Sequence, residues 1–258
     1  KNLGYAMHLD VENLNNFYSD SALGQFTKKQ LQDSVKELWS SKPEGLIAGY
    51  GFTPPILSTF SNSKQQILCL MPGQQGVISW PQHEDNRSVL VEETSWPLAT
   101  ESIDRLVVLH GLETSEKLKD LFQEMWRVLA PSGKVIFVVP NRTGWWARSE
   151  STPFGQGRPY SIRQLKNQLK LNRFKIEQYV TALYTPPFEK LHSLRIAEFL
   201  ENLGRKFYSR FGAGIILLEA TKQVYAVNTP PVGVGAGRSL NVLDEFSDPK
   251  PASKTYRG

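Results

Sequence analysis

Short apolar runs alternate with amphipathic segments along most of this chain. Strands are predicted where apolar residues follow one another, because a strand that is covered on both faces shows little alternation. The segments of this kind are 45–51, 65–71, 88–93, 102–113, 134–140, 174–180 and 214–224. Strands at this spacing, with helices between them, predict an α/β fold in which a mostly parallel sheet carries helices on both faces.

Helices are predicted where apolar residues return every three or four positions. The clearest is 114–129, whose leucine, phenylalanine and methionine residues share one face. Another begins at Ser161, which forms a capping box with Gln164. The other helical segments are 20–39, 52–60 and an inserted region around 191–203.

These patterns divide the chain into three parts. Residues 1–40 form an N-terminal extension and a helix, and residues 41–226 form the α/β domain. Residues 227–258 are rich in proline, glycine and charged residues, a composition that cannot bury enough apolar surface to order itself. They are predicted to be a flexible tail.

Composition excludes several classes of protein. No apolar run approaches the roughly 18 residues of a membrane span, and no signal peptide is recognisable, so a cytoplasmic protein is expected. Cys69 is the single cysteine and the four histidines show no ligand spacing, so no metal site is expected. The net charge of +5 is modest and is spread over helix faces, which disfavours a nucleic-acid partner.

A glycine turn after the first strand marks the ligand-binding edge. In sheets of this kind ligands bind at the carboxyl ends of the strands. Gly49 and Gly51 would let the backbone turn tightly and approach a ligand. Thr53 is predicted to cap the next helix, with Pro54 in its first turn.

The segment from the third strand to the fifth contains Glu92, then Trp96-Pro97-Leu98, then Asp104, and finally "RVLAPSGK" from Arg127. With these residues it strongly resembles the class I S-adenosylmethionine-dependent methyltransferases. The order and spacing of these elements match that superfamily over about 40 residues, and a looser likeness extends from residue 40 to 225. The segments "FYSDSALG", "LMPGQQGV" and "ATKQVYA" are also similar to an alphaproteobacterial branch of the superfamily.

This resemblance implies a fold and a cofactor. The expected fold is a Rossmann-like three-layer sandwich with a seven-stranded sheet of order 3-2-1-4-5-7-6, in which strand 7 is antiparallel. The expected cofactor is S-adenosylmethionine. Ile47 and Thr53 stand where the superfamily carries an acid and a third glycine, and Met71 stands near the usual ribose-binding acid. Cofactor binding is therefore expected to be weak or absent.

The resemblance also assigns cofactor contacts. Gly49, Gly51 and Glu92 would hold the cofactor, with Gln74 as a ribose partner and Glu92 near the adenine amino group. The neighbouring Glu93 is expected to be solvated.

His110, at the end of the fourth strand, is the candidate catalytic base, because the pKa of histidine lies near neutrality. The alternative for His110 is a structural histidine, half-buried and bonded to a backbone carbonyl. Asp104 is expected to fix the turn into the fourth strand rather than to act in chemistry.

The loop 141–160 follows the fifth strand and is the candidate substrate-binding segment. Its tryptophans could stack on a planar group, and its arginines could hold an anion. The candidate residues are Asn141, Trp145, Trp146, Arg148 and Arg158. The alternative is a lid, a surface for a protein partner, or tryptophans that only cover the edge of the sheet.

The leading function is S-adenosylmethionine-dependent methyl transfer to a small anionic or aromatic acceptor. The alternative is a non-catalytic module that keeps the fold and has lost part of the cofactor site, with a protein partner bound by the loop 141–160 or the tail. A nucleic-acid methyltransferase ranks last, because "LHGLE" stands at the fourth strand instead of an Asn/Asp-Pro-Pro-Tyr motif.

Overall fold

The computed structural model describes residues 9–39, 44–61, 65–187, 201, 204 and 212–224. Contacts divide the chain into two units, Lys1–Val224 and Tyr225–Gly258, and all described residues belong to the first. The predicted tail lies outside the described residues, as does the inserted helical region apart from single positions. The three-part division of the chain stays a prediction.

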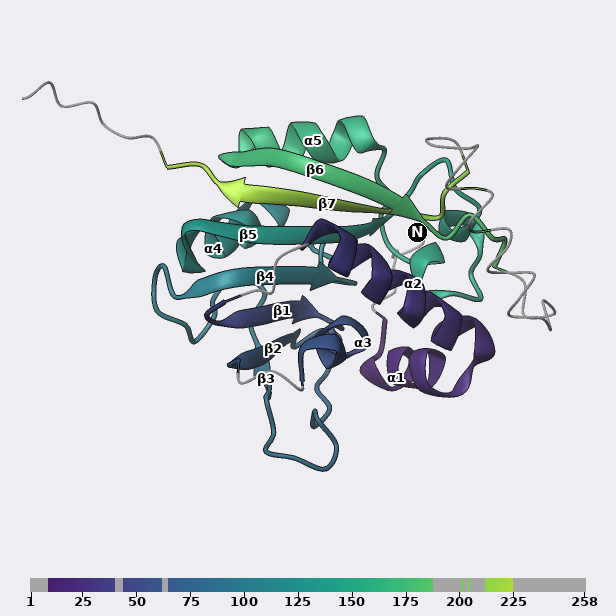
Figure 1. Ribbon diagram of the computed structural model, residues 1–258, viewed down its shortest axis with the longest axis horizontal. Coiled ribbons are helices and arrows are strands. Elements are labelled where there is room, and N and C mark those ends of the chain that lie inside the picture. The colour runs from purple at the N-terminus through teal and green to yellow at the C-terminus, as the bar shows by residue number, and fades with distance from the viewer. Residues whose placement is uncertain are drawn as a thin grey trace, which may run out of the picture. The chain divides into compact units, whose positions relative to one another are not determined.

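The core of the first unit is a seven-stranded sheet of order β3-β2-β1-β4-β5-β7-β6 (Figure 1). Strands β1 to β5 run parallel, whereas β7 is antiparallel to both of its neighbours, as predicted. The strands are β1 (Ile47–Gly51), β2 (Ile67–Pro72), β3 (Ser88–Val91), β4 (Ile103–Leu109), β5 (Leu129–Pro140), β6 (Phe174–Ala182) and β7 (Ile215–Lys222).

Helices cover both faces of this sheet and form the predicted three layers. The helices are α1 (Val11–Asp20), α2 (Ala22–Leu38), α3 (Pro54–Leu57), α4 (Leu118–Val128) and α5 (Ile162–Leu171), with 3-10 turns η1 (Ser58–Phe60), η2 (Trp146–Arg148) and η3 (Pro153–Gly155). One buried cluster joins α1, α2 and α3 to the sheet, and a second joins α4 and α5 to its other face. In Figure 1 the arrowheads of β1 and β4 point toward α1 and α3, so this end of the sheet is its carboxyl edge.

Helix α1 was not predicted. Asp10 caps it by accepting a hydrogen bond from the backbone N–H of Glu12 (3.0 Å). Val11, Leu14 and Tyr18 are its buried residues, and the backbone N–H of Val11 donates to the carbonyl of Gln75 (2.8 Å). Helix α1 therefore packs against the loop that follows β2, at the carboxyl edge.

Helix α4 begins at Leu118, four residues later than predicted. The side chain of Thr114 donates to the carbonyl of His110 (3.1 Å), and both the Ser115 hydroxyl and the Lys117 N–H donate to the Glu93 carboxylate. These bonds hold 114–117 as a loop, because they engage the groups that would otherwise start the helix.

Two other boundaries differ from the sequence expectation. Strand β5 begins at Leu129, paired with Ile103, so the predicted break before Lys134 is an irregularity within a strand. Thr53 precedes α3 as predicted, but its hydroxyl makes no capping bond. It lies 3.2 Å from the Sγ of Cys69 instead, which ties α3 to β2.

Within the part of the chain that the structure describes, no helix combines the length and apolarity that a membrane span requires. The same residues contain no cluster of three or more side chains suited to a metal ion. The cytoplasmic location and the absence of a metal both stay predictions.

Candidate functional site

The glycine turn after β1 is packed against the protein's own chain. Gly51 has φ +87°, a left-handed conformation that favours glycine, and a Cβ there would collide with the carbonyl oxygen of Leu109. A Cβ on Gly49 would collide with the side chain of Thr53. The two glycines therefore allow β1, β4 and α3 to approach closely.

At the end of β4 three buried polar side chains form a chain of hydrogen bonds. The Tyr18 hydroxyl lies 2.8 Å from Nε2 of His110, and Nδ1 of His110 lies 3.1 Å from Oε1 of Glu113. The side chains of His110 and Glu113 have no exposed surface, and Tyr18 is 4% exposed. His110 is thus fully buried between two side chains, rather than half-buried against a backbone carbonyl.

The second carboxylate oxygen of Glu113, Oε2, is buried and has no hydrogen-bond partner among the described residues. Its negative charge acts on neighbouring groups. Burial, and then the charge of Glu113, raise the pKa of Tyr18 well above its ordinary value. The same two causes raise the pKa of Tyr160 to about 12, although the positive charge of Arg158 opposes them. Glu113 is therefore a buried acid that faces two tyrosines.

The backbone of His110 is in an unusual conformation. Its φ of +56° lies in the left-handed region, which few residues other than glycine adopt. Its carbonyl accepts hydrogen bonds from the side chains of Gln75 and Thr114. Such conformations persist where the surroundings over-determine them, and they concentrate at functional sites.

Of the two glutamines after β2, one is exposed and the other is buried. Gln74, the predicted ribose partner, is exposed, whereas Gln75 is 4% exposed and bonds to His110. Met71, in the region where the superfamily carries the ribose-binding acid, is 1% exposed and belongs to the apolar core. Ile47 is likewise buried in that core. The departures from the superfamily pattern are therefore core residues.

The acids after β3 separate in the same way. Glu92, the predicted adenine contact, is exposed, and Glu93 is 8% exposed. The expectation that Glu93 is solvated was wrong, because its carboxylate accepts from the Ser115 hydroxyl and the Lys117 N–H. Glu93 holds the loop that leads from β4 into α4.

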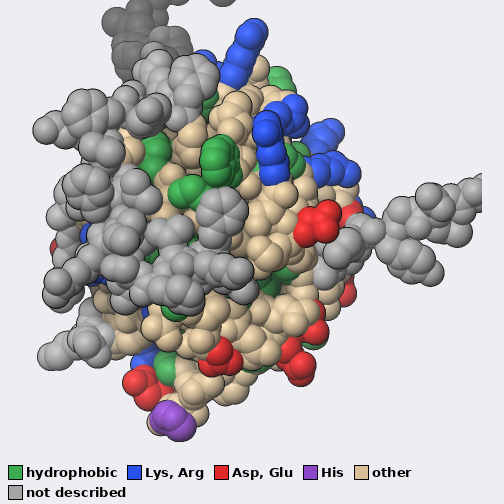
Figure 2. Space-filling view, turned by 90° about the vertical axis from the view of Figure 1, so that its right-hand side faces the viewer, with side chains coloured by type: hydrophobic (Ala, Val, Ile, Leu, Met, Phe, Trp, Pro, Cys, Tyr) green, Lys and Arg blue, Asp and Glu red, His purple; other side chains and the backbone are tan. Residues whose placement is uncertain are grey.

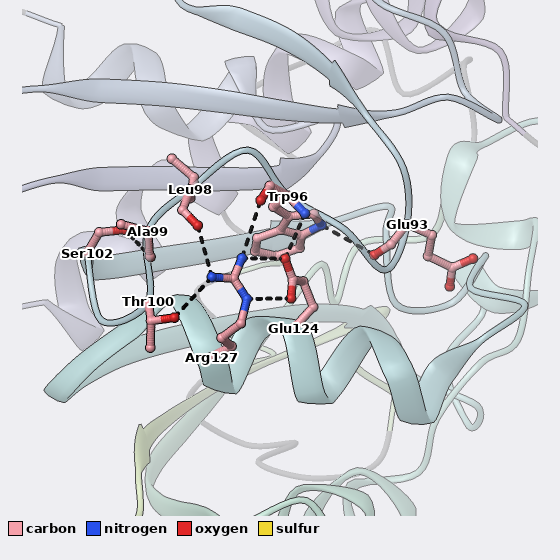
Figure 3. Close-up of polar contacts among 8 residues, drawn as sticks. All are labelled: Glu93, Trp96, Leu98, Ala99, Thr100, Ser102, Glu124 and Arg127. Atoms are coloured by element: carbon pink, nitrogen blue, oxygen red, sulfur yellow. Dashed lines mark hydrogen bonds and ion pairs between the residues drawn. The ribbon is translucent and has the colours of Figure 1, made fainter.

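An ion pair with a buried carboxylate and a half-exposed guanidinium anchors the loop between β3 and β4 to α4 (Figure 3). The Arg127 guanidinium donates two bonds to the Glu124 carboxylate (2.8 and 2.7 Å) and one to the carbonyl of Leu98 (2.9 Å). The same carboxylate accepts from the backbone N–H of Trp96 (2.7 Å). The Trp96 ring stacks on Tyr50 with centroids 4.8 Å apart. Two motifs that are distant in the sequence, "WPL" and "RVLAPSGK", are thus joined here.

The loop 141–160 is closed at its base. Arg142 N–H donates to the carbonyl of Tyr160 (2.9 Å), and Tyr160 N–H donates to the carbonyl of Pro140 (2.9 Å). Asn141 is 5% exposed and its Nδ2 donates to the carbonyl of Ala213 (2.9 Å). In this structure Asn141 therefore anchors the loop.

The other predicted residues of this loop lie in different surroundings. Trp146 is fully buried and its Nε1 donates to the carbonyl of Thr185 (2.7 Å). Trp145 is 56% exposed, and Arg148 and Arg158 are exposed as well. Trp146 is linked to His110 through Phe154, whose ring centroid lies 5.9 Å from that of Trp146 and 4.7 Å from that of His110. The substrate-binding roles of all five residues stay predictions.

Figure 2 looks onto the carboxyl edge of the sheet. Lysine and arginine side chains gather in its upper part, and acidic side chains occur mostly in its lower half. Among the described residues, charge of both signs is therefore present on this face.

Comparison with known proteins shows what this arrangement resembles. Residues 49–137 match the family model described as a methyltransferase domain. A search of curated proteins finds no match. The match spans β1 to β5, which includes the glycine turn, the acids after β3 and the end of β4.

Solved structures with this fold include three methyltransferases of low sequence identity. A methyltransferase from Archaeoglobus fulgidus has a TM-score of 0.58 at 14% identity, and the match covers 83% of this chain and 100% of that one. A "possible histamine N-methyltransferase" from Thermotoga maritima has a TM-score of 0.55 at 17% identity, with 78% and 91% covered. Geranyl diphosphate C-methyltransferase from Streptomyces coelicolor A3(2) has a TM-score of 0.52 at 14% identity, with 76% and 79% covered.

The sheet order, the family model and these likenesses agree. The chain has the class I methyltransferase fold, and its residues 49–137 match the methyltransferase domain model. In this fold the carboxyl edge of β1, β2, β3 and β4 is the region of interest.

Sequence reasoning missed two residues at this edge of the methyltransferase fold, Tyr18 and Glu113. Tyr18 lies on the helix that was not predicted, although Val11, Leu14 and Tyr18 have helical spacing after an Asp10 cap. Glu113 follows His110 by three residues. No sequence pattern indicated that it is buried, because a glutamate before a polar run is usually exposed to solvent.

Proposed function

We propose that this protein transfers a methyl group from S-adenosylmethionine to a small-molecule acceptor. One observation supports the proposal above others. A buried histidine with a left-handed backbone ends β4 at the carboxyl edge of a methyltransferase sheet, and its ring nitrogens are bonded to Glu113 and Tyr18. A buried base with an anchored tautomer suits removal of a proton from an acceptor.

The described residues fit the chemistry of the cofactor. Gln74 and Glu92 are exposed after neighbouring strands and offer oxygens to ribose hydroxyls and to the adenine amino group. The unpartnered Oε2 of Glu113 offers negative charge to a cation. Gly49 and Gly51 complete the proposed cofactor-binding set. S-adenosylmethionine, when bound, supplies a methyl group on a sulfonium, which is a good leaving group.

The side chains present explain why binding is expected to be weak. A buried Met71 cannot accept the ribose hydroxyl bonds that a carboxylate would, and such charge-assisted bonds contribute about 1.5–3 kcal/mol each. The ring of Tyr18 stacks on Phe52 beside the glycine turn, with centroids 5.9 Å apart. Tyr18 must therefore shift if a ligand is to reach this part of the turn.

His110 is the proposed catalytic residue. Its Nε2 takes the proton from the acceptor, while Glu113 holds Nδ1–H and stabilises the imidazolium. The exposed Trp145, Arg148 and Arg158 are proposed to meet an anionic or aromatic acceptor at the surface, and the buried Asn141 and Trp146 to hold the loop in place. A protein partner on this loop or on residues 227–258 stays a prediction.

A non-catalytic binding module is not favoured, because the matched family model and the compared structures are methyltransferases. Calorimetric titration with S-adenosylmethionine and S-adenosylhomocysteine separates the two. Measurable binding, weakened by the missing ribose-binding acid, is expected for a methyltransferase. No heat at millimolar ligand, together with an unshifted melting temperature, would contradict the proposal.

A further inference from the structure

The hydroxyl of Tyr18 already contacts His110, the proposed catalytic base. It lies 2.8 Å from Nε2 of His110, the atom that would receive the acceptor's proton. Helix α1 places it there, although Tyr18 precedes His110 by 92 positions in the chain. Its phenol ring is almost completely buried in the site.

The direction of the hydrogen bonds follows from the donors and acceptors present. The carboxylate of Glu113 can only accept, so Nδ1 of the neutral imidazole carries the hydrogen and Nε2 is the acceptor. The Tyr18 hydroxyl therefore donates to Nε2. A hydroxyl is presented to the histidine in the orientation that an acceptor alcohol would need in order to lose its proton.

Aromatic rings surround this hydroxyl. The Tyr18 ring stacks on Phe52 at an interplanar angle of 16°, and His110 lies between Tyr18 and Phe154, with ring centroids at 5.9 and 4.7 Å. A flat ring with a hydroxyl at its edge is thus the group that the site accommodates in this structure.

A cavity adjoins the ring and gives it space to move into. Tyr18 and Phe52 line a hollow of about 240 Å³ between α1, α3 and the loop after β2. Its walls include Pro54, Ile78 and Trp80, with Asn15 and Lys28 among its polar residues. This hollow is the space that borders the Tyr18 ring on the side of α1 and α3.

We propose that Tyr18 is an internal stand-in for the acceptor, and that the acceptor is a phenol whose hydroxyl replaces that of Tyr18 on His110. This inference rests on the proposed function. A ligand without a hydroxyl would leave the buried Nε2 unpaired, which weakens binding roughly tenfold or more. His110 therefore selects ligands that carry a hydroxyl, and Glu113 is the positioning residue that fixes the tautomer of His110.

The proposed step is a methyl transfer coupled to loss of the phenol's proton. The phenol passes its hydroxyl proton to Nε2 of His110 while its oxygen bonds to the methyl carbon of S-adenosylmethionine. The bond between that carbon and the sulfonium sulfur breaks, and its electron pair goes to the sulfur. The products are S-adenosylhomocysteine and a methyl ether. Glu113 offsets the positive charge that forms on the imidazole.

The first test asks whether the vacated space prefers a phenol. Tyr18→Ala removes the group that phenol would replace, so phenol is expected to bind this variant at least about tenfold more tightly than benzene, as measured by calorimetry. Phe17→Ala is the matched control, because it opens space beside Tyr18 on the same helix while the Tyr18 hydroxyl stays on His110, and no preference is expected there. Equal binding of phenol and benzene to Tyr18→Ala would overturn the inference.

The second test keeps the ring, in case Tyr18→Ala does not fold. Tyr18→Phe removes only the competing hydroxyl, so methylation of added phenol is expected to be about tenfold faster than with the unaltered protein. The ¹⁵N resonance of His110 Nε2 is expected to shift in the variant, as it loses a donor, and to return toward its original value when phenol is added. A slower reaction, or a resonance that phenol does not restore, would overturn the inference.

Calorimetry with S-adenosylhomocysteine on the same samples distinguishes the two proposals. If no sample binds it, the proposed function fails, whereas the comparison of phenol with benzene still decides whether the site takes a phenol. If it binds and phenol shows no preference for Tyr18→Ala, only the inference about Tyr18 fails.

Discussion

Replacement of Arg127 by methionine should destabilise the protein strongly, because it removes the anchor of the loop between β3 and β4. Methionine keeps much of the apolar stem and removes the guanidinium. That group makes three hydrogen bonds of 2.9 Å or less, two of them to the carboxylate of Glu124. The Glu124 side chain is 9% exposed and would keep only the bond from the Trp96 N–H.

The expected loss follows from these contacts. Hydrogen bonds to charged groups contribute about 1.5–3 kcal/mol each, and an acid left without its buried partner adds a penalty. The Arg127 side chain is 35% exposed, which screens part of this energy, and the contacts are not additive. A loss of about 3 kcal/mol in the free energy of unfolding is therefore expected, which corresponds to a fall of roughly 6–12 °C in melting temperature.

The loss should also depend on pH. Burial alone would raise the pKa of Glu124, but the bonds from Arg127 and Trp96 and the charge of Arg127 outweigh it, so the pKa lies below its ordinary value of 4.5. An acid with a lowered pKa contributes stability above its ordinary pKa, and this contribution is lost as the pH falls through the value in the folded state. The difference between the original protein and Arg127→Met should therefore shrink as the pH falls from neutral to below 4.5.

Thermal melts followed by circular dichroism at several pH values would measure both effects. Arg163→Met, on the exposed face of α5, is the matched control and should change the stability by no more than about 0.5 kcal/mol. A loss below about 1 kcal/mol for Arg127→Met, or one that does not vary with pH, would refute the view that this ion pair anchors the loop.

Three further outcomes are expected. Glu92→Ala should weaken binding of S-adenosylhomocysteine roughly tenfold in calorimetry if Glu92 holds the adenine, and unchanged affinity would remove it from the site. Arg158→Ala should impair binding of an anionic acceptor while lowering stability by less than about 1 kcal/mol, because the side chain is exposed; a large fall in melting temperature would mean a structural role. Burial raises the pKa of Cys69 to about 11, so a thiol reagent near neutral pH should modify it only after unfolding, and rapid labelling of the native protein would contradict its burial.

The sheet could be predicted from the sequence because its strands are covered on both faces. Residues Val107–Leu109 of β4, for example, have no exposed surface, and so they form an apolar run that periodicity detects. The capping box at Ser161 was confirmed for the same kind of reason, since both of its bonds are local.

The site could be predicted only in part, because neighbouring residues at the end of a strand point to opposite sides. The sequence placed two glutamines after β2 and two glutamates after β3, but not which of each pair turns inward. The structure buries Gln75 and Glu93 and leaves Gln74 and Glu92 exposed. A shift of one residue therefore exchanges a structural side chain for a candidate ligand contact.

The contact between Tyr18 and His110 could not be predicted at all. It joins residues 92 positions apart through a helix whose asparagine-rich sequence gives weak periodicity. Such a contact depends on how α1 packs across the sheet edge, and no local pattern records that.

The placement of α1 and α2 bears on how the chain folds as it is synthesised. These helices precede the strands in the chain, and some of the side chains that contact them come much later. Tyr18 bonds to His110, and the carbonyl of Leu38 accepts a bond from Gln178 across 140 residues. Contacts of such long range form slowly, since loop closure must precede them. The bonds of Tyr18 and Leu38 therefore complete the packing of the first two helices late in folding.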